Sequence, residues 1–384
     1  MDSFLFSPPE RTATKANWRS PPHSSWSYRN IRQLFPTAPI EASKSPLVLN
    51  ASPRDIGDTE FEWHAGKSTL ARTIADTKTD GFLVLRGRDI LFEYYAPGST
   101  SQTLHLCFSV TKSITATVAL ALADRGRLDL SALVTRYIPE LAGSAYEGAT
   151  VQQVLDMTIA ILYDESYEVL DGDVQNYRRA TGFEPPVPGC APGLRAMHMR
   201  HPRGDWPHGQ RYHYVSPNTD VLGWIIERAG GETYARLASD LVWSPMGAEN
   251  EAMIVVDGCG APVACGGFCA SLRDLGRFGL TLTAANEGVL APNTVDDIYV
   301  GGDREAWARR TIDFMPGGAY RNQFYLPPGD RQTAYAIGIY GQWIYIDRNS
   351  GIVIVKQSCH DRPSMAEVDD RLMACFDAVA AAVR

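Results

Sequence analysis

The 384-residue sequence lacks the features of a membrane or exported protein. No segment reaches the roughly 18 apolar residues that a transmembrane helix requires. The opening stretch, MDSFLFSPPERTATK, has no basic region and no long apolar core, so we expect no secretory signal. Basic residues are in deficit, because 44 Asp and Glu exceed 36 Lys and Arg and leave a net charge of -8. We therefore expect a cytoplasmic protein that binds neither nucleic acid nor a membrane.

The sequence also lacks a metal or redox motif. It has seven cysteines, an odd number with no C-x-x-C pair: Cys107, Cys190, Cys259, Cys265, Cys269, Cys359 and Cys375. Without an export signal, reduced thiols are the expected state. The spacing of His198, His201 and His213 fits no zinc motif, so we interpret them as solvated or hydrogen-bonded side chains. We expect no metal and no cofactor.

The composition is that of a globular protein, with 45% apolar and 21% charged residues. The length exceeds a single small core and favours one large domain or two interleaved lobes. Residues 1–50 are rich in Pro and Ser, yet they contain Trp18, Trp26 and Tyr28. Disordered segments usually lack aromatic residues, so we expect an N-terminal arm packed on the body.

Strand signals occur toward both ends of the chain. FLVLRGRDILFEYY (82–95) predicts a hairpin around the turn RGRD. AYAIGIYGQWIYI (334–346) and GIVIVKQS (351–358) flank DRNS and predict a second hairpin. SMAE (364–367) matches a capping box that would open a final helix.

Helix signals lie between the strands, at 109–124, near 150–157 and at 219–229. The stretch 160–213 has no clear periodicity, which is unusual for so long a segment unless it is functional. This order of elements predicts an α+β fold with an antiparallel sheet flanked by helices and an all-helical insertion.

The predicted elements suggest a division of the chain into two lobes. We expect 51–125 and 262–384 to form an α/β lobe, and 126–261 to form a mainly helical lobe. The active site would lie between the lobes, and the protein would be a monomer or a homodimer.

The stretch FSVTKS (108–113) places Ser109 and Lys112 three positions apart at the start of an apolar helix. Positions i and i+3 share a helix face, so the two side chains are predicted neighbours. A helix N-terminus favours negative charge on a serine, and apolar surroundings lower the pKa of a lysine and equip it for proton transfer. The S-x-x-K pattern is the nucleophile motif of β-lactamases and penicillin-binding proteins. The alternative is an N-capping serine beside a snorkelling lysine.

Chemistry of this type needs a phenol as a second proton-transfer group. YHYVSPNTDVLGWIIER (212–228) supplies Tyr214 just before a predicted helix. The segment is similar to the Y-x-N element of serine β-lactamases, with Ser216 where Asn is usual. The alternative is a half-buried core tyrosine.

These motifs resemble the family of penicillin-recognising serine hydrolases, which includes class C β-lactamases and related esterases. Further similarity covers ADRGRLDLSALVTRYIPEL (123–141), VQQVLDMTIAI (151–161) and GGFCASLRDLGRFG (266–279). WRSPPHSSW (18–26) and IGIYGQWIYID (337–347) are closer still to the branch that hydrolyses nylon oligomers. The resemblance implies a serine β-lactamase-like α/β sandwich.

The resemblance also implies roles for individual residues. Ser109 would be the nucleophile, Lys112 its activating partner and Tyr214 the general acid and base. The oxyanion hole would consist of the backbone N–H groups of Ser109 and of a strand residue at or near Ile337. Ala334, Tyr335 and Ala336 stand where K-T-G is usual, so we expect slow or absent hydrolysis of β-lactams.

Four positions would contact substrate by the same resemblance. Tyr167 would close over the leaving amine, Phe324 would cover the acyl side, Ser216 belongs to the Y-x-N element, and Cys265 falls near the position that holds a free amine. Residues 181–210 have no clear counterpart in that branch. Asp164 and Glu165 would either attract an amine or be solvated loop acids.

Three functions are compatible with these residues. The first is a serine hydrolase that cleaves a small-molecule amide or ester through an acyl-Ser109 intermediate. The second is an ATP-independent acyltransferase that passes the acyl group to an amine acceptor. The third is a catalytically silent ligand-binding protein on the same fold.

Overall fold

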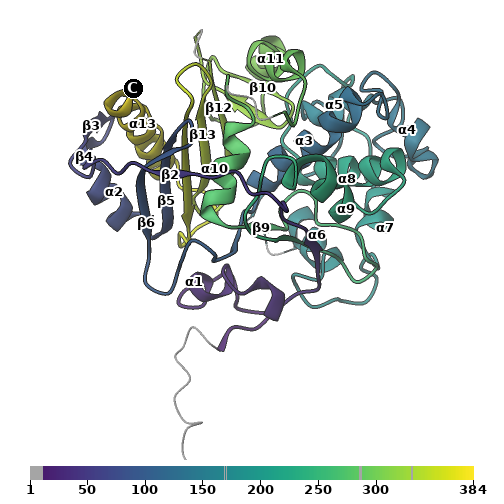
Figure 1. Cartoon of the computed structure of the whole chain (residues 1–384). Coiled ribbons are helices and arrows are strands. Elements are labelled where there is room, and N and C mark those ends of the chain that lie inside the picture. The colour runs from purple at the N-terminus through teal and green to yellow at the C-terminus, as the bar shows by residue number, and fades with distance from the viewer. Residues whose placement is uncertain (1–11, 168, 170, 285–287, 330–331) are drawn as a thin grey trace, which may run out of the picture.

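The computed structural model describes residues 12–167, 169, 171–284, 288–329 and 332–384. In Figure 1 a twisted sheet with a helix on either face occupies one side of the molecule, and a group of helices occupies the other. Among the described residues, none of the helices is long and apolar enough to span a bilayer.

The large sheet has eight strands, and only its edge pair β2 and β6 is parallel. In spatial order its strands are β10 (Ala319–Arg321), β11 (Phe324–Leu326), β12 (Thr333–Gly338), β13 (Gln342–Asp347), β14 (Ile352–Ser358), β5 (Thr79–Arg86), β6 (Asp89–Tyr95) and β2 (Asn50–Ala51). The hairpin predicted at 82–95 is confirmed as β5 and β6, with RGRD as its turn.

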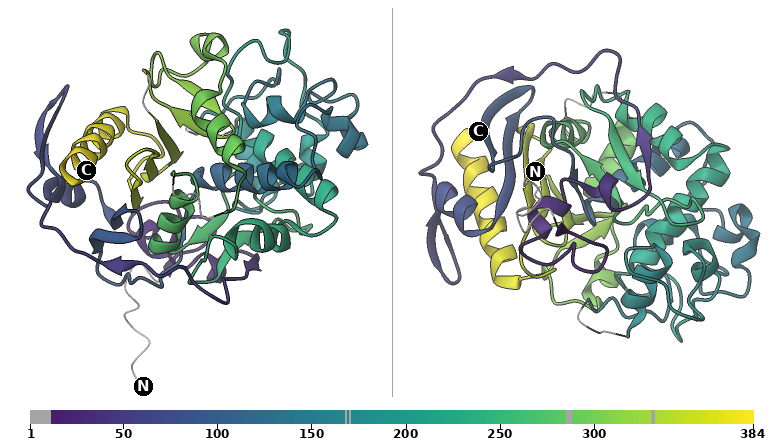
Figure 2. Two further views of the ribbon diagram at one scale, coloured as in Figure 1. Left: turned by 45° about the horizontal axis from the view of Figure 1, so that its top comes forward. Right: turned by 90° about the horizontal axis from the view of Figure 1, so that it is seen from below.

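The central strands are continuous apolar runs because helices cover both faces of the sheet. Helix α10 (Leu272–Leu280) packs on one face, where Gly276 lies so close that a Cβ there would be 2.7 Å from Leu83. Helix α13 (Ala366–Val383) packs on the other, with the Phe376 ring against Phe82. Figure 2 shows the same order of layers from two further directions. The α+β fold with helices on an antiparallel sheet is confirmed.

The helical region surrounds α3 (Val110–Asp124), which is buried along almost its whole length and packs against α8 (Ser216–Gly230). The remaining α-helices are α1 (Ser24–Ser27), α2 (Leu70–Asp76), α4 (Val134–Tyr137), α5 (Val151–Leu155), α6 (Asp173–Ala180), α7 (Leu194–His198), α9 (Tyr234–Ala238), α11 (Pro292–Val300) and α12 (Arg304–Ala308). Short 3-10 turns are η2 (Ile31–Gln33) and η3 (Pro139–Leu141), and η4 (Ser239–Trp243) is a π-helix.

A second, four-stranded sheet draws its strands from the N-terminal arm and from both predicted lobes, and of these strands β8 lies within 126–261. Its order is β1 (Thr37–Ile40), β8 (Ala252–Val255), β9 (Phe268–Ala270) and β7 (His105–Leu106). A separate hairpin is formed by β3 (Glu60–Trp63) and β4 (Gly66–Thr69). The N-terminal residues contribute β1, so they pair with β8 in antiparallel register.

The described part of the N-terminal segment lies against the body. Trp18 and Tyr28 are buried, and the Tyr28 ring contacts the Phe108 ring edge-on at 4.9 Å between centroids. Phe108 immediately precedes Ser109, so residues of this segment reach the start of α3.

Three local predictions need correction. The run 334–346 is two strands, because Tyr340 (φ 62°) and Gly341 (φ 86°) turn the chain between β12 and β13. The capping box at 364–367 is wrong, because α13 starts after Met365 without a side-chain cap. The irregular stretch 160–213 contains the short helices α6 and α7.

Candidate active site

The Ser–Lys pair lies at the N-terminus of α3, where Ser109 is the N-cap residue. The preceding residue, Phe108, has a φ of 44°, a strained conformation of the kind that clusters at functional sites. Both Ser109 and Lys112 are buried, with exposed fractions of 9% and 2%. The turn therefore presents the serine hydroxyl inward, toward the lysine.

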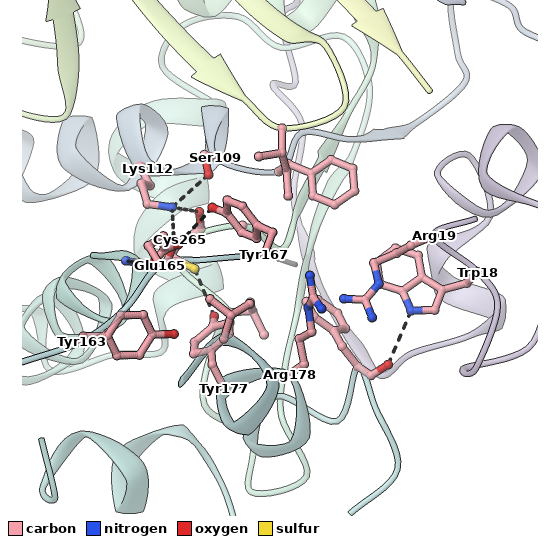
Figure 3. A pocket seen from close by; sticks show the side chains of 17 residues that line it. Trp18, Arg19, Ser109, Lys112, Tyr163, Glu165, Tyr167, Tyr177, Arg178 and Cys265 are labelled. Atoms are coloured by element: carbon pink, nitrogen blue, oxygen red, sulfur yellow. Dashed lines mark hydrogen bonds between the residues drawn. The ribbon is translucent and has the colours of Figure 1, made fainter. Parts of the chain in front are cut away.

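The Lys112 ammonium nitrogen is held by three oxygen atoms. Its Nζ atom lies 3.0 Å from Ser109 Oγ, 3.1 Å from Ser216 Oγ and 2.9 Å from the carbonyl oxygen of Cys265. An ammonium group has three donors, so this arrangement uses all of them and fixes the direction of the side chain. Figure 3 shows Lys112 between these partners.

Tyr214 stands beside the pair, with its ring centroid 5.1 Å from Lys112 Nζ. Burial raises the pKa of the Tyr214 phenol well above its usual range, and the charge of Glu165 raises it further. Hydrogen bonding with Ser109 and Ser216 lowers the pKa of Tyr214, but this effect is smaller than the effect of burial. The phenol is therefore protonated at neutral pH and is a potential proton donor.

Glu165 links the residues around the pair. Its carboxylate accepts hydrogen bonds from the backbone N–H of Ser216 at 2.9 Å, from the Ser216 hydroxyl, and from the Tyr167 hydroxyl at 3.0 Å. Sequence reasoning left Glu165 as either an amine-attracting or a solvated acid. The structure instead places it within the hydrogen-bonded network that positions Ser216 and Tyr167.

Strand β12 brings a second backbone segment up to Ser109. A Cβ on Gly338 would lie 2.7 Å from the carbonyl oxygen of Cys107 and 2.9 Å from the backbone nitrogen of Ser109, so only glycine fits there. Among the described residues, neither the N–H of Ser109 nor that of Ile339 donates a hydrogen bond. The backbone N–H groups of Ser109 and Ile339 are therefore two available donors beside the point where Gly338 approaches the start of α3.

The expected strand residue, Ile337, is two positions away from this point. Ile337 lies within the β12–β13 ladder opposite Trp343, whereas Ile339 follows the strand and lines both cavities beside Ser109. The three residues before Ile339 are Ala336, Ile337 and Gly338, so this register also has no lysine where K-T-G is usual.

The remaining predicted contact residues divide into two groups. Ser216, Cys265 and Tyr167 line the cavity that contains Ser109 and Lys112. Phe324 does not, because it is fully buried in the core, and the next strand residue, Tyr325, lines the site instead. Successive side chains of a strand point to opposite faces, which explains the one-residue error.

Two hollows meet at Ser109. The first, which we call the arginine cavity, is lined by residues that include Trp18, Arg19, Lys112, Tyr177 and Arg178. The second, which we call the acidic cleft, runs past Tyr214 to the start of α13; its carboxylates are Asp164, Glu165, Asp313 and Asp369.

A buried polar network lies behind Cys265. The Cys265 N–H donates to Asp220 at 2.9 Å, and the Tyr177 hydroxyl lies 3.0 Å from Cys265 Sγ. Burial raises the pKa of Asp220 to about 7. His198 lies 3.9 Å from Asp220 and 3.3 Å from His201, so these two histidines are buried rather than solvated.

A serine lies at the start of a buried helix, and a lysine follows one turn later. This arrangement on this fold is typical of the serine enzymes that carry an S-x-x-K motif. The sequence profile of the beta-lactamase family matches residues 70–378. The chain belongs to the beta-lactamase family.

Two relatives by sequence are hydrolases. The 6-aminohexanoate-dimer hydrolase of Paenarthrobacter ureafaciens is 36% identical over 361 residues, which is 91% of this chain and 89% of the relative. Esterase EstB of Burkholderia gladioli is 33% identical over 152 residues, which is 38% of this chain and 37% of the relative. The resemblance to the nylon-oligomer branch of the family is confirmed, and this chain is a hydrolase of that family.

Solved structures agree with this assignment. A Bacillus anthracis protein provisionally assigned as a 6-aminohexanoate-dimer hydrolase superimposes with a TM-score of 0.86 at 25% identity, covering 97% of each chain. EstCE1, a hydrolase with promiscuous acyltransferase activity, shares the fold with a TM-score of 0.62 at 16% identity, covering 80% of this chain and 96% of EstCE1.

Proposed function

We propose that this protein hydrolyses a small amide or ester through an acyl intermediate on Ser109. The observation that carries the proposal is the buried contact between Ser109 Oγ and Lys112 Nζ at 3.0 Å, with the protonated Tyr214 phenol beside it. The two relatives by sequence, an amide hydrolase and an esterase, support the reaction class.

In the acylation step, Ser109 Oγ forms a bond to the substrate carbonyl carbon, and the bond to the leaving nitrogen or oxygen breaks. Tyr214 gives its proton to the leaving atom and is reprotonated from Ser109 through Lys112. The proton lost by the serine thus balances the proton gained by the leaving group. Water then adds to the ester carbonyl carbon, one of its protons passes to Ser109 Oγ as the Oγ–carbon bond breaks, and a carboxylic acid leaves.

The negative oxygen of the intermediate would be held by the N–H groups of Ser109 and Ile339. Both groups lie where β12 meets α3, and neither is used by another acceptor within the described residues. Preorganised donors of this kind typically contribute about 3 kcal/mol each to the transition state. The absence of a lysine in the preceding residues favours amides and esters over β-lactams.

Acyl transfer to an amine is the second candidate, and the acidic cleft favours it. An amine acceptor would approach from the leaving-group side, where Asp164, Asp313 and Asp369 attract an ammonium group. Hydrolysis and transfer would then share the acyl-Ser109 intermediate and differ only in the acceptor. For the cellular setting, we propose the cytoplasm, because all seven cysteines are free thiols.

Intact-protein mass spectrometry during turnover of p-nitrophenyl acetate tests the proposal. We expect an added acetyl mass on the wild-type protein and none on Ser109→Ala, with a loss of several orders of magnitude in kcat/KM. Adding an amine and identifying the product separates hydrolysis from transfer. Acetylation of Ser109→Ala at full stoichiometry would overturn the assignment of the nucleophile.

A further inference from the structure

The two hollows that meet at Ser109 differ in charge. The described residues that line the acidic cleft include four carboxylates, Asp164, Glu165, Asp313 and Asp369, and neither a lysine nor an arginine. The arginine cavity has the opposite balance, because Arg19, Arg178 and Lys112 face one carboxylate, Glu165. A substrate that spans Ser109 therefore meets a positive wall at one end and a negative wall at the other.

Arg178 is a half-buried cation with few direct partners among the described residues. Among the described residues its guanidinium forms no ion pair, and its one hydrogen bond is a long one of 3.4 Å to the side-chain oxygen of Gln175. Burial lowers the pKa of Arg178 and the nearby charge of Arg19 lowers it further, while the charge of Glu184 acts in the opposite direction. Because Glu184 pairs with Arg19, the two arginines keep one net positive charge that an anion would neutralise.

Arg19 reaches the same cavity from the N-terminal segment. Its guanidinium pairs with Glu184 and lies over the Trp18 ring, 5.3 Å from the ring centroid. Figure 3 shows the guanidinium groups of Arg19 and Arg178 pointing toward one another, while Ser109 lies on the far side of Tyr167. Guanidinium groups bind carboxylates with paired, directional hydrogen bonds.

Much of the lining of the arginine cavity is apolar. Its apolar lining residues include Phe108, Val174, Phe183, Val263 and Ile339. A hydrocarbon chain fits such a wall, and an anionic group at its end would meet the guanidinium pair.

The orientation of the substrate follows from Tyr214. Tyr214 lines the acidic cleft and not the arginine cavity. As the proposed proton donor to the leaving atom, it directs the leaving group into the acidic cleft. The acyl group must then extend into the arginine cavity.

We infer that Arg19 and Arg178 form a carboxylate-binding subsite for the acyl group, so that the preferred substrates are half-amides or half-esters of dicarboxylic acids. The inference rests on the proposed function and specifies its substrate class. The leaving group is a neutral or cationic amine or alcohol. The acyl-Ser109 intermediate carries a free carboxylate, and water releases it as the dicarboxylic acid.

Matched p-nitrophenyl esters test the inference on the unmodified protein. One set comprises the monoesters of adipic and suberic acid, and the other comprises the same esters with a terminal carboxamide in place of the carboxylate. We expect kcat/KM to be about 10- to 100-fold higher for the carboxylates, the range that charge-assisted hydrogen bonds supply. The carboxamide has the same length and shape, so the ratio reports the charge.

Variants then assign the preference to the subsite. Arg178→Gln should lower kcat/KM for the carboxylate ester more than for the carboxamide ester, so that the ratio of the two falls to about one. Arg178→Glu should reverse the charge preference, so that kcat/KM becomes higher for an ω-amino acyl ester than for the carboxylate ester. Arg179→Gln is the matched control, because Arg179 lies on the same helix but contacts Asn176 and Asp171 outside the cavity. Arg178→Lys retains the charge and should keep part of the preference.

The possible outcomes separate the inference from the proposed function. Equal kcat/KM for carboxylate and carboxamide in the wild-type protein, with acyl-Ser109 observed, overturns the subsite alone. The subsite is also overturned if Arg178→Gln keeps the full wild-type ratio of kcat/KM for carboxylate over carboxamide esters. If Ser109 is acylated by none of the esters, the proposed function fails and the inference fails with it.

Discussion

At the scale of single residues, the site depends on how two tyrosines differ. Tyr214 lies against Lys112, while the Tyr167 hydroxyl donates to Glu165. Because Glu165 in turn holds Ser216, a chain of hydrogen bonds connects Tyr167 to Lys112. We therefore expect proton transfer to depend on Tyr214 and closure over the leaving group to depend on Tyr167.

Replacing each tyrosine by phenylalanine tests this division. Tyr214→Phe should lower kcat/KM by about 100-fold or more for a matched ester and amide alike, since both reactions need the proton donor. Tyr167→Phe should reduce amide turnover far more than ester turnover, because an amide nitrogen must be protonated or held as its bond breaks. Equal losses on both substrates for Tyr167→Phe would contradict the division.

The sequence predicts residues that are close along the chain better than residues brought together by folding. Ser109 and Lys112 are one helical turn apart, so their contact follows from helix geometry alone. Glu165 was left undecided because its partners, Ser216 and Tyr167, meet it through the packing of the segment before α6. The raised pKa of Tyr214 likewise follows from burial and from the charge of Glu165, which only the folded chain brings together.

At the scale of elements, the approach of β12 to α3 determines the site. Gly338 is the last residue of β12 and lies against the backbone of Cys107 and Ser109. The distance between the N–H groups of Ser109 and Ile339 therefore depends on the absence of a side chain at this one position.

Adding a methyl group at Gly338 should separate the two elements. In Gly338→Ala the new Cβ would lie 2.7 Å from the carbonyl oxygen of Cys107, so the strand must shift and the two N–H groups must diverge. We expect kcat/KM for an ester to fall about 100-fold, the usual effect of losing one oxyanion donor. Gly57→Ala is the control, because a Cβ there has only an ordinary contact at 3.8 Å. An unchanged kcat/KM for Gly338→Ala would contradict this role of β12.

Several long elements and the short helix α5 were predicted from the sequence, whereas the shortest strands were not. Helix α3 and the strands β5, β6 and β14 are continuous apolar runs whose length and composition identify them. Strands β7 and β9 have two and three residues and owe their pairing to distant partners, so no local pattern indicates them. The proposed donor Ile339 is two residues from the predicted Ile337, because an unbroken apolar run does not reveal the turn at Tyr340.

At the scale of the whole molecule, buried charges couple folding to pH. Burial raises the pKa of Asp220 from the ordinary value of 3.8 to about 7. The folded protein therefore holds a proton on Asp220 that the unfolded chain has already released. The free energy of unfolding contributed by this group falls as the pH rises from about 4 to about 7.

Asp220→Asn should remove this contribution because the amide does not ionise. We expect the Tm of the variant, relative to that of the wild-type protein, to increase as the pH rises from about 4 to about 7 and then to stay level. Asp240→Asn is the control, because Asp240 is an exposed partner of Arg236. Thermal unfolding of the three proteins across this pH range measures the difference, and a constant Tm gap would contradict a raised pKa of Asp220.

The first segment of the chain to be synthesised is among the last that can reach its final position. Strand β1 pairs with β8, and Arg19 pairs with Glu184, so the N-terminal segment must wait on the ribosome until most of its partners have been made. Synthesis proceeds at about 5–20 residues per second, which leaves Arg19 without Glu184 for many seconds. Incomplete chains would thus contain the serine and the lysine but lack Tyr214 and the strand that completes the backbone donors. An unfinished translation product would therefore be inactive toward esters and amides, because the order of synthesis delays the assembly of the reactive centre to the end.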